Sequence, residues 1–194
     1  MKDNTLEETI SKMRDYIRRE VAGGFSSTDD ICRVAVEIYS DKHDPSVLLP
    51  HARTLVQEMI DAQLSEQANW KKTTDCDRLD QAFRELESQG IISRQNYSCC
   101  GTCGSGEIWD EMIALQSEGK NVRGYTFYHE QDTEHAVDGD GLYLNYGSIE
   151  ENVPAQIDIG HEIIRILNQH DLATDWNGDL QYRIFVKLNW QRRR

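Results

Sequence analysis

A change in the spacing of the apolar residues near position 75 constrains the fold more than any other feature. Before this point apolar residues recur every three or four positions, as they do on one face of a helix. The first such stripe consists of Leu6, Ile10, Met13, Ile17 and Val21. Beyond it, short extended runs alternate with helical stretches. The sequence therefore predicts two domains, a helical N-terminal part over residues 1–72 and an α+β domain over residues 75–194.

Residues that cap helices predict where the three N-terminal helices begin. Thr5 precedes the first apolar stripe and has an acid three positions later, which is the capping-box pattern. Residues 26–28, Ser-Ser-Thr, offer a cap to a second helix, whose apolar face is expected to include Ile38. Asp44 followed by Pro45 is typical of an N-cap and the first helical position. This third helix is expected to end near Trp70.

The second part is expected to interleave strands and helices around one sheet. Extended patterns cover residues 91–97, 124–129, 142–146 and 182–188. Helices are expected between them, with Ser105 as the N-cap of the helix after Cys103 and Pro154 as the first residue of another. Asn177-Gly178 predicts a tight type I′ hairpin turn. The fold class is therefore α+β, with a three-helix N-terminal part packed on a mixed-sheet α/β domain.

Net charge and cysteine usage argue against several classes of protein. The net charge of −13 repels phosphate backbones, so nucleic acid is not expected as a partner. No apolar run approaches the roughly 18 residues of a membrane helix, and the N-terminus lacks the apolar core of a signal peptide. Five cysteines, an odd number with three bunched together, are not typical of a secreted disulfide framework. We therefore expect a cytoplasmic protein without a membrane partner, while a protein partner stays open.

The segment Cys99–Cys103, Cys-Cys-Gly-Thr-Cys, lies where a strand is expected to lead into a helix. The amides and dipole of a helix N-terminus stabilise a thiolate, and a thiol three residues on can resolve a mixed disulfide. Cys100 would then be the nucleophile and Cys103 the resolving thiol. This order of strand, CxxC and helix resembles the thioredoxin family. That family also places a proline at a strand start facing the cysteines, whereas Pro154, the only later proline, is expected to start a helix.

Two other interpretations of the same segment stay open. Cys99, Cys100 and Cys103, together with His129 or His135, could supply a tetrahedral zinc shell. Structural zinc sites usually pair two close-spaced ligand knuckles, however, and the sequence has one; adjacent cysteines would also point apart in an extended chain. The last interpretation is structural, with small buried thiols packed at a crowded turn.

Titratable groups concentrate directly after the strand expected at 124–129. Three acids follow His129 within five positions, and a carboxylate beside an imidazole orients the ring and tunes its pKa for acid–base chemistry. The alternative is a short solvated helix with acids near its N-terminus. Cys100, Cys103 and His129 are thus the candidate catalytic residues, and zinc is the cofactor that the residue types allow.

Three longer motifs carry a resemblance to a known family. They are CCxxCGxxEIWDE from Cys99, GYxFYHxQDTE from Gly124 and GLYLxYG from Gly141, followed by a closing Leu188-x-Trp190. Together they resemble an uncharacterised family of bacterial proteins known only as a domain of unknown function, over residues 75–190. The resemblance implies a bacterial, cytoplasmic origin but no activity, cofactor or partner. It also suggests that the cysteine turn and residues 131–134 form one neighbourhood.

No complete catalytic motif is present in the sequence. We therefore expect first a non-enzymatic binding or interaction protein, and whether the chain is an enzyme stays open. The alternatives are a thiol-redox protein that uses Cys100 and Cys103, and a zinc-binding domain that uses the cluster Cys99–Cys103.

Overall fold

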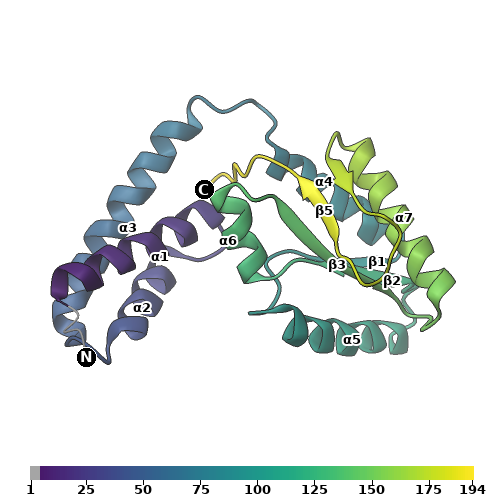
Figure 1. The fold of residues 1–194 in the computed structure, drawn as a ribbon, viewed down its shortest axis with the longest axis horizontal. Helices are drawn as coiled ribbons and strands as arrows, with labels where there is room; N and C mark the ends of the chain where they lie inside the picture. The colour runs from purple at the N-terminus through teal and green to yellow at the C-terminus, as the bar shows by residue number, and fades with distance from the viewer. Residues whose placement is uncertain (1–4) are drawn as a thin grey trace. The chain divides into compact units, whose positions relative to one another are not determined.

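The computed structural model describes residues 5–194, and it divides into two compact units. One unit runs as far as Lys72 and includes Gln191–Arg194; the other is Thr73–Trp190. The predicted α+β fold class is confirmed, because three N-terminal helices pack together and a mixed five-stranded sheet with interleaved helices follows (Figure 1). The assignment of two separate domains stays a prediction.

Three helices form the first unit: α1 (Leu6–Gly23), α2 (Thr28–Tyr39) and α3 (Pro45–Gln67). Thr5, Ser27 and Asp44 each accept a hydrogen bond from a backbone N–H of the first helical turn, which confirms the predicted helix starts. The prediction for Ile38 is wrong, because its side chain is 46% exposed while Tyr39 is buried instead. The end predicted near Trp70 is also wrong, since α3 stops at Gln67.

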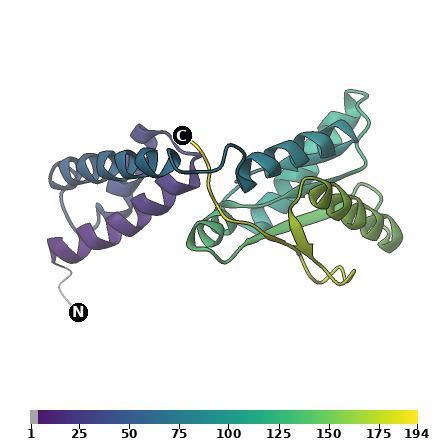
Figure 2. The same cartoon turned by 90° about the horizontal axis from the view of Figure 1, so that it is seen from above.

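The helices of this unit enclose a core of their own. α1 packs against α3, and both pack against α2 (Figures 1 and 2). Fully buried side chains between them include Met13, Ile17, Ile31, Leu48 and Val56. The end of the chain belongs to the same unit, because the Gln63 side-chain amide donates to the Arg192 carbonyl at 3.0 Å.

Five strands form the sheet of the second unit: β1 (Ile91–Arg94), β2 (Gly124–Phe127), β3 (Leu142–Ser148), β4 (Ala173–Asp175) and β5 (Ile184–Lys187). Their order is β1-β2-β3-β5-β4, with β1 parallel to β2 and the other pairs antiparallel. The four predicted strands are confirmed, and β4 was not predicted. The prediction of a tight turn at Asn177-Gly178 is wrong. The pairing of β4 with β5 ends at Asp175, opposite Phe185, and residues 176–183 form a longer loop.

Four helices accompany the sheet: α4 (Asp75–Ser88), α5 (Gly101–Ser117), α6 (Glu130–Asp138) and α7 (Val153–Gln169). α4 and α5 cover opposite faces of the sheet (Figure 1). Consecutive side chains of an extended segment point to opposite faces, so two neighbouring residues at the end of β2 contact different helices. Phe127 joins the buried cluster under α5, whereas the Tyr128 ring packs edge-on against Phe83 of α4. α7 is present as predicted, but it begins at Val153, so Pro154 is its second residue and not its first.

The predicted N-cap of α5 is wrong. The helix begins at Gly101 with Cys100 as the N-cap residue, so that Ser105 lies inside it and donates its hydroxyl to the Gly101 carbonyl at 2.8 Å. Because β1 and β2 are parallel, their carboxyl ends lie at one edge of the sheet, and α5 and α6 both begin there. This edge of an α/β sheet is where ligand sites are commonly built.

Candidate functional site

The loops that follow β1 and β2 are hydrogen-bonded to each other at this edge. The Tyr97 N–H donates to the Tyr128 carbonyl at 2.8 Å, and the Glu130 N–H donates to the Ser98 carbonyl at 3.2 Å. The loop after β1 turns sharply, since Asn96 and Ser98 adopt left-handed conformations with φ of 49° and 62°. The cysteine segment and the start of α6 are therefore one neighbourhood, as the resemblance suggested.

The turn brings three sulfurs together. The ligand atoms of Cys99, Cys100 and Cys103 all lie within 4.8 Å of one another. The expectation that adjacent cysteines point apart is wrong, because it assumed a straight extended strand, whereas the chain bends at residues 98–100 before α5 begins. The packing interpretation is also wrong for Cys99 and Cys103, which are exposed, whereas Cys32 and Cys76 are buried.

The thiols of Cys100 and Cys103 have different proton affinities. The backbone N–H of Cys103 and then its thiol group lower the pKa of Cys100, with a smaller contribution from the Thr102 N–H. The hydrogen bond from Cys103 to the Cys100 sulfur, together with the neighbouring Cys99, raises the pKa of Cys103 to about 11. Cys100 is therefore the thiol that loses its proton first, as expected for a sulfur at a helix N-terminus.

Gly104 lets the first turn of α5 approach the sheet closely. A Cβ atom at Gly104 would lie 2.6 Å from Cε2 of Phe127, so only glycine fits there without displacement. A Cβ atom at Gly101 would lie 3.7 Å from the His129 ring and from Oδ1 of Asn145. The imidazole of His129 thus lies beside the residue that follows Cys100.

His129 is the N-cap residue of α6 and is buried. Its Nδ1 accepts from the Asp132 N–H at 3.3 Å, and its Nε2 lies 3.1 Å from the Asp132 carboxylate. Burial lowers the pKa of His129, which outweighs the opposing effect of Asp132. The ring is therefore neutral with its proton on Nε2. The short helix is confirmed, and Glu130 and Gln131 at its start are exposed, whereas Asp132 is only 1% exposed.

Arg183 belongs to this site and was not predicted. Its Nη1 donates to both Asp132 oxygens, at 2.9 and 3.0 Å, and lies 3.4 Å from Nε2 of His129. The guanidinium carbon lies 5.0 Å from the centre of the Tyr143 ring. Asn145 was also missed, and its amide nitrogen is buried without a hydrogen-bond partner among residues 5–194. Neither residue lies in a motif with a recognisable function.

His129 lies outside the group of three sulfurs in this structure. The group of metal-ligating side chains that the described chain brings together contains Cys99, Cys100 and Cys103 without a histidine. The structure therefore assembles the predicted thiols and places His129 beside them through Gly101. The four-ligand zinc shell stays a prediction.

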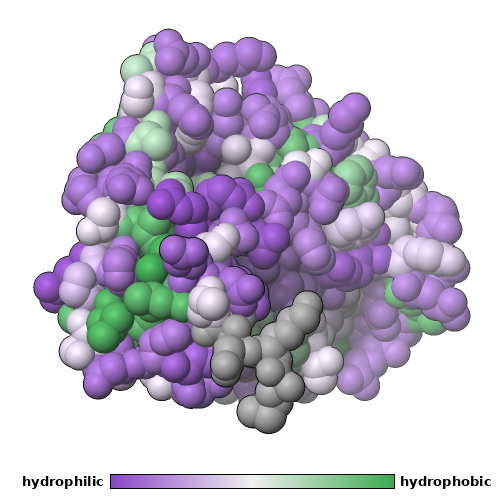
Figure 3. Space-filling model, turned by 60° about the vertical axis from the view of Figure 1, so that its left-hand side comes forward, coloured by the Kyte–Doolittle hydropathy of each residue, from purple (hydrophilic) through white to green (hydrophobic). Residues whose placement is uncertain are grey.

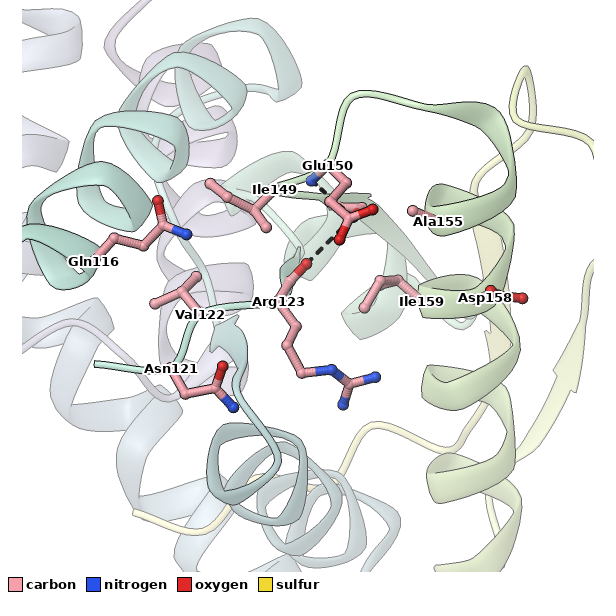
Figure 4. A pocket seen from close by; sticks show the side chains of 10 residues that line it. Gln116, Asn121, Val122, Arg123, Ile149, Glu150, Ala155, Asp158 and Ile159 are labelled. Carbon is pink, nitrogen blue, oxygen red and sulfur yellow. Dashed lines mark hydrogen bonds between the residues drawn. The ribbon is translucent and has the colours of Figure 1, made fainter. Parts of the chain in front are cut away.

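A separate polar pocket of about 610 Å³ lies at the opposite end of β2 (Figure 4). It opens between the end of α5 and the start of α7, and Arg123, Glu150 and Asp158 are among its lining residues. The Arg123 guanidinium is paired with Glu162 at 2.6 Å. None of the predicted site residues lines this pocket.

Comparison with known proteins identifies the family. The model of the domain of unknown function DUF6891 matches residues 6–194. The chain belongs to the DUF6891 family. This confirms the predicted resemblance and extends it over α1–α3. No curated protein and no solved structure matches the chain.

The three motifs that carried the resemblance meet at the site in this DUF6891 protein. The first covers the cysteine turn and the start of α5, the second covers β2 and the start of α6, and the third covers most of β3, which carries Tyr143 and Asn145. The family description names no activity, so a function has to be argued from the chemistry of these side chains. Within the described chain, none of the helices has the length and apolar character that crossing a membrane requires.

Proposed function

We propose that this DUF6891 protein carries out thiol–disulfide exchange at the start of α5. Cys100 is the nucleophile and Cys103 is the resolving thiol. The observation that carries the proposal is the close approach of accessible sulfurs at a helix N-terminus, where backbone N–H groups favour the Cys100 thiolate.

The reaction transfers two electrons from the dithiol to a disulfide. The Cys100 thiolate attacks one sulfur of the substrate disulfide, forms a mixed disulfide and releases the other sulfur as a thiolate, which takes up a proton. Cys103 then loses its proton and attacks the Cys100 sulfur. This step closes the Cys100–Cys103 disulfide and releases the second substrate thiolate. A low-molecular-weight thiol regenerates the dithiol by the reverse exchange.

Single cysteine-to-serine variants of the whole chain test this order of events. After addition of hydroxyethyl disulfide, intact-protein mass spectrometry should show an internal disulfide in the unmodified chain and in Cys99→Ser. Cys103→Ser should accumulate a mixed disulfide on Cys100, because the resolving thiol is missing. Cys100→Ser should form neither species at a comparable rate, since it lacks the thiol whose pKa is lowered by the backbone N–H groups at the start of α5. Equal reaction of Cys100→Ser and the unmodified chain would refute the proposal.

A metal site formed by the three thiolates is the second candidate. It is favoured by the third sulfur, that of Cys99, which lies as close as the other two and which dithiol exchange does not use. Protein purified under reducing, chelator-free conditions should then contain one zinc per chain, and Cys99→Ser should lose it. If the purified protein contains no metal and Cys99→Ser still catalyses exchange, the metal site is refuted and the dithiol proposal stands.

The interpretation as a non-enzymatic interaction protein stays a prediction. Large exposed hydrophobic side chains support it, and one face shows such residues gathered among hydrophilic ones (Figure 3). Those of the first unit are Ile38, Val47 and Leu64. This interpretation predicts neither disulfide exchange nor bound zinc in the experiments above. A cytoplasmic location also stays a proposal, which the odd number of cysteines, with three of the five bunched together, supports.

A further inference from the structure

We infer that the thiol site takes small disulfides that carry a carboxylate, and that Arg183 holds this carboxylate beside Cys100. The inference rests on the proposed thiol–disulfide exchange and adds the substrate class. It is supported by the contacts that fix the Arg183 guanidinium and by the position of that guanidinium relative to the start of α5.

Arg183 is a preorganised guanidinium. One amino group, Nη1, is fixed by both oxygens of the buried Asp132 carboxylate, and the guanidinium lies over the ring of Tyr143. Its other N–H groups, on Nη2 and Nε, make no hydrogen bond within the described chain, and the side chain is 37% exposed. A planar guanidinium with N–H groups on one open edge matches the geometry of a carboxylate.

Two contacts connect this guanidinium to the residue that follows the nucleophile. Nη1 is 3.4 Å from the His129 ring, which in turn contacts the position of Gly101, the residue after Cys100. Strand register leads to the same place. Phe127 pairs with Asn145, and continuing the pairing of Leu144 with Ile184 by one residue sets Asn145 opposite Arg183. The three paired residues, Phe127, Asn145 and Arg183, thus extend across the sheet from beneath the first turn of α5 to the guanidinium.

Two further features favour an anion at this point. The buried amide nitrogen of Asn145 is a donor without a partner in residues 5–194, and it lies under the start of α5. α5 and α6 both begin at this edge of the sheet, so their N-termini add positive potential. A net charge of −13 repels large acidic partners, which favours a small anionic disulfide over an acidic protein segment.

Three aliphatic disulfides of similar size and different charge test the inference on the unmodified chain. They are 3,3′-dithiodipropionate, hydroxyethyl disulfide and cystamine, which are anionic, neutral and cationic. Each exchange rate is divided by the rate of free 2-mercaptoethanol with the same disulfide. Without a local anion site, the negative net charge makes the anionic probe the slowest and lets salt raise its rate. The inference predicts the opposite order, with salt lowering the rate of the anionic probe.

Arg183→Gln and Arg84→Gln form a matched pair of variants, since Arg84 is an exposed residue of α4. Arg183→Gln should lower the ratio of the normalised rate with dithiodipropionate to that with hydroxyethyl disulfide about tenfold, the size of a charge-assisted contact. Arg84→Gln should change neither rate. Circular dichroism verifies that Arg183→Gln folds, and the salt dependence of the unmodified chain tests the inference should that variant unfold.

The outcomes separate this inference from the proposed function. If none of the probes reacts at Cys100, thiol exchange itself fails. If all react but the anionic probe is slowest and accelerates with salt, exchange stands and the carboxylate inference is overturned. The carboxylate inference is also overturned if Arg183→Gln slows the exchange of all three probes equally.

Discussion

The first turn of α5 positions the cysteines only because Gly104 lets it lie directly on β2. A Cβ atom added at Gly104 would be 2.6 Å from Cε2 and 2.9 Å from Cζ of Phe127, well inside the 3.5–4.0 Å of a normal carbon contact. Phe127 is fully buried and has no space into which to retreat. Gly104→Ala should therefore lift the helix start by about 1 Å or distort the ring, at a cost of about 1–3 kcal/mol.

Gly106 supplies the matched control within the same helix. A Cβ atom there meets nothing within 4 Å, so Gly106→Ala should gain about 0.5–1 kcal/mol from helix propensity alone. Gly104→Ala has a similar gain, which largely cancels in the comparison. The difference in free energy of unfolding between the two variants is therefore expected to be about 1–3 kcal/mol, with Gly104→Ala the less stable.

Urea unfolding of the whole chain, followed by tryptophan fluorescence and circular dichroism, measures this difference. Trp109 lies in α5 and reports on it directly. In thermal unfolding the same difference corresponds to about 5 °C in Tm. Equal stability of the two variants would show that α5 does not press on Phe127 and that its start lies elsewhere than in this structure.

Three further predictions concern the charges around the sheet. Asp132→Asn should destabilise the chain by about 2 kcal/mol in urea unfolding, because a buried carboxylate paired with Arg183 is lost. Glu162→Gln should cost only about 0.5 kcal/mol in the same assay, since its partner Arg123 is 43% exposed; a larger loss than for Asp132→Asn would contradict the role of burial. The folded pKa of His129 lies below the unfolded value of about 6.5, so its contribution to stability is complete above that pH and is lost as the pH falls towards the folded pKa. His129→Asn keeps a capping side chain and should flatten this dependence in unfolding measured from pH 7 to pH 5; an unchanged slope would assign it to other groups.

Helix starts and most strands of this chain follow from the sequence. Thr5, Ser27 and Asp44 act on backbone N–H groups at most three residues away, so their effect is local and can be read from spacing. The same holds for the alternation of Ile184 and Val186 in β5. The local signal was misread at Ser105, because α5 begins at Gly101 without a side-chain cap hydrogen bond.

The chemical site shows the same division. Sequence reasoning found Cys100, Cys103 and His129, because CxxC before a helix and histidine near acids are recognisable patterns. It could not find Arg183, whose partner Asp132 is 51 residues away, or Asn145, which reaches the site through strand pairing with Phe127. It also misjudged how Cys99 lies relative to Cys100, because the chain bends at residues 98–100. Local hydrogen bonds and periodicity set the elements, whereas pairing between distant segments decided which side chains share the site.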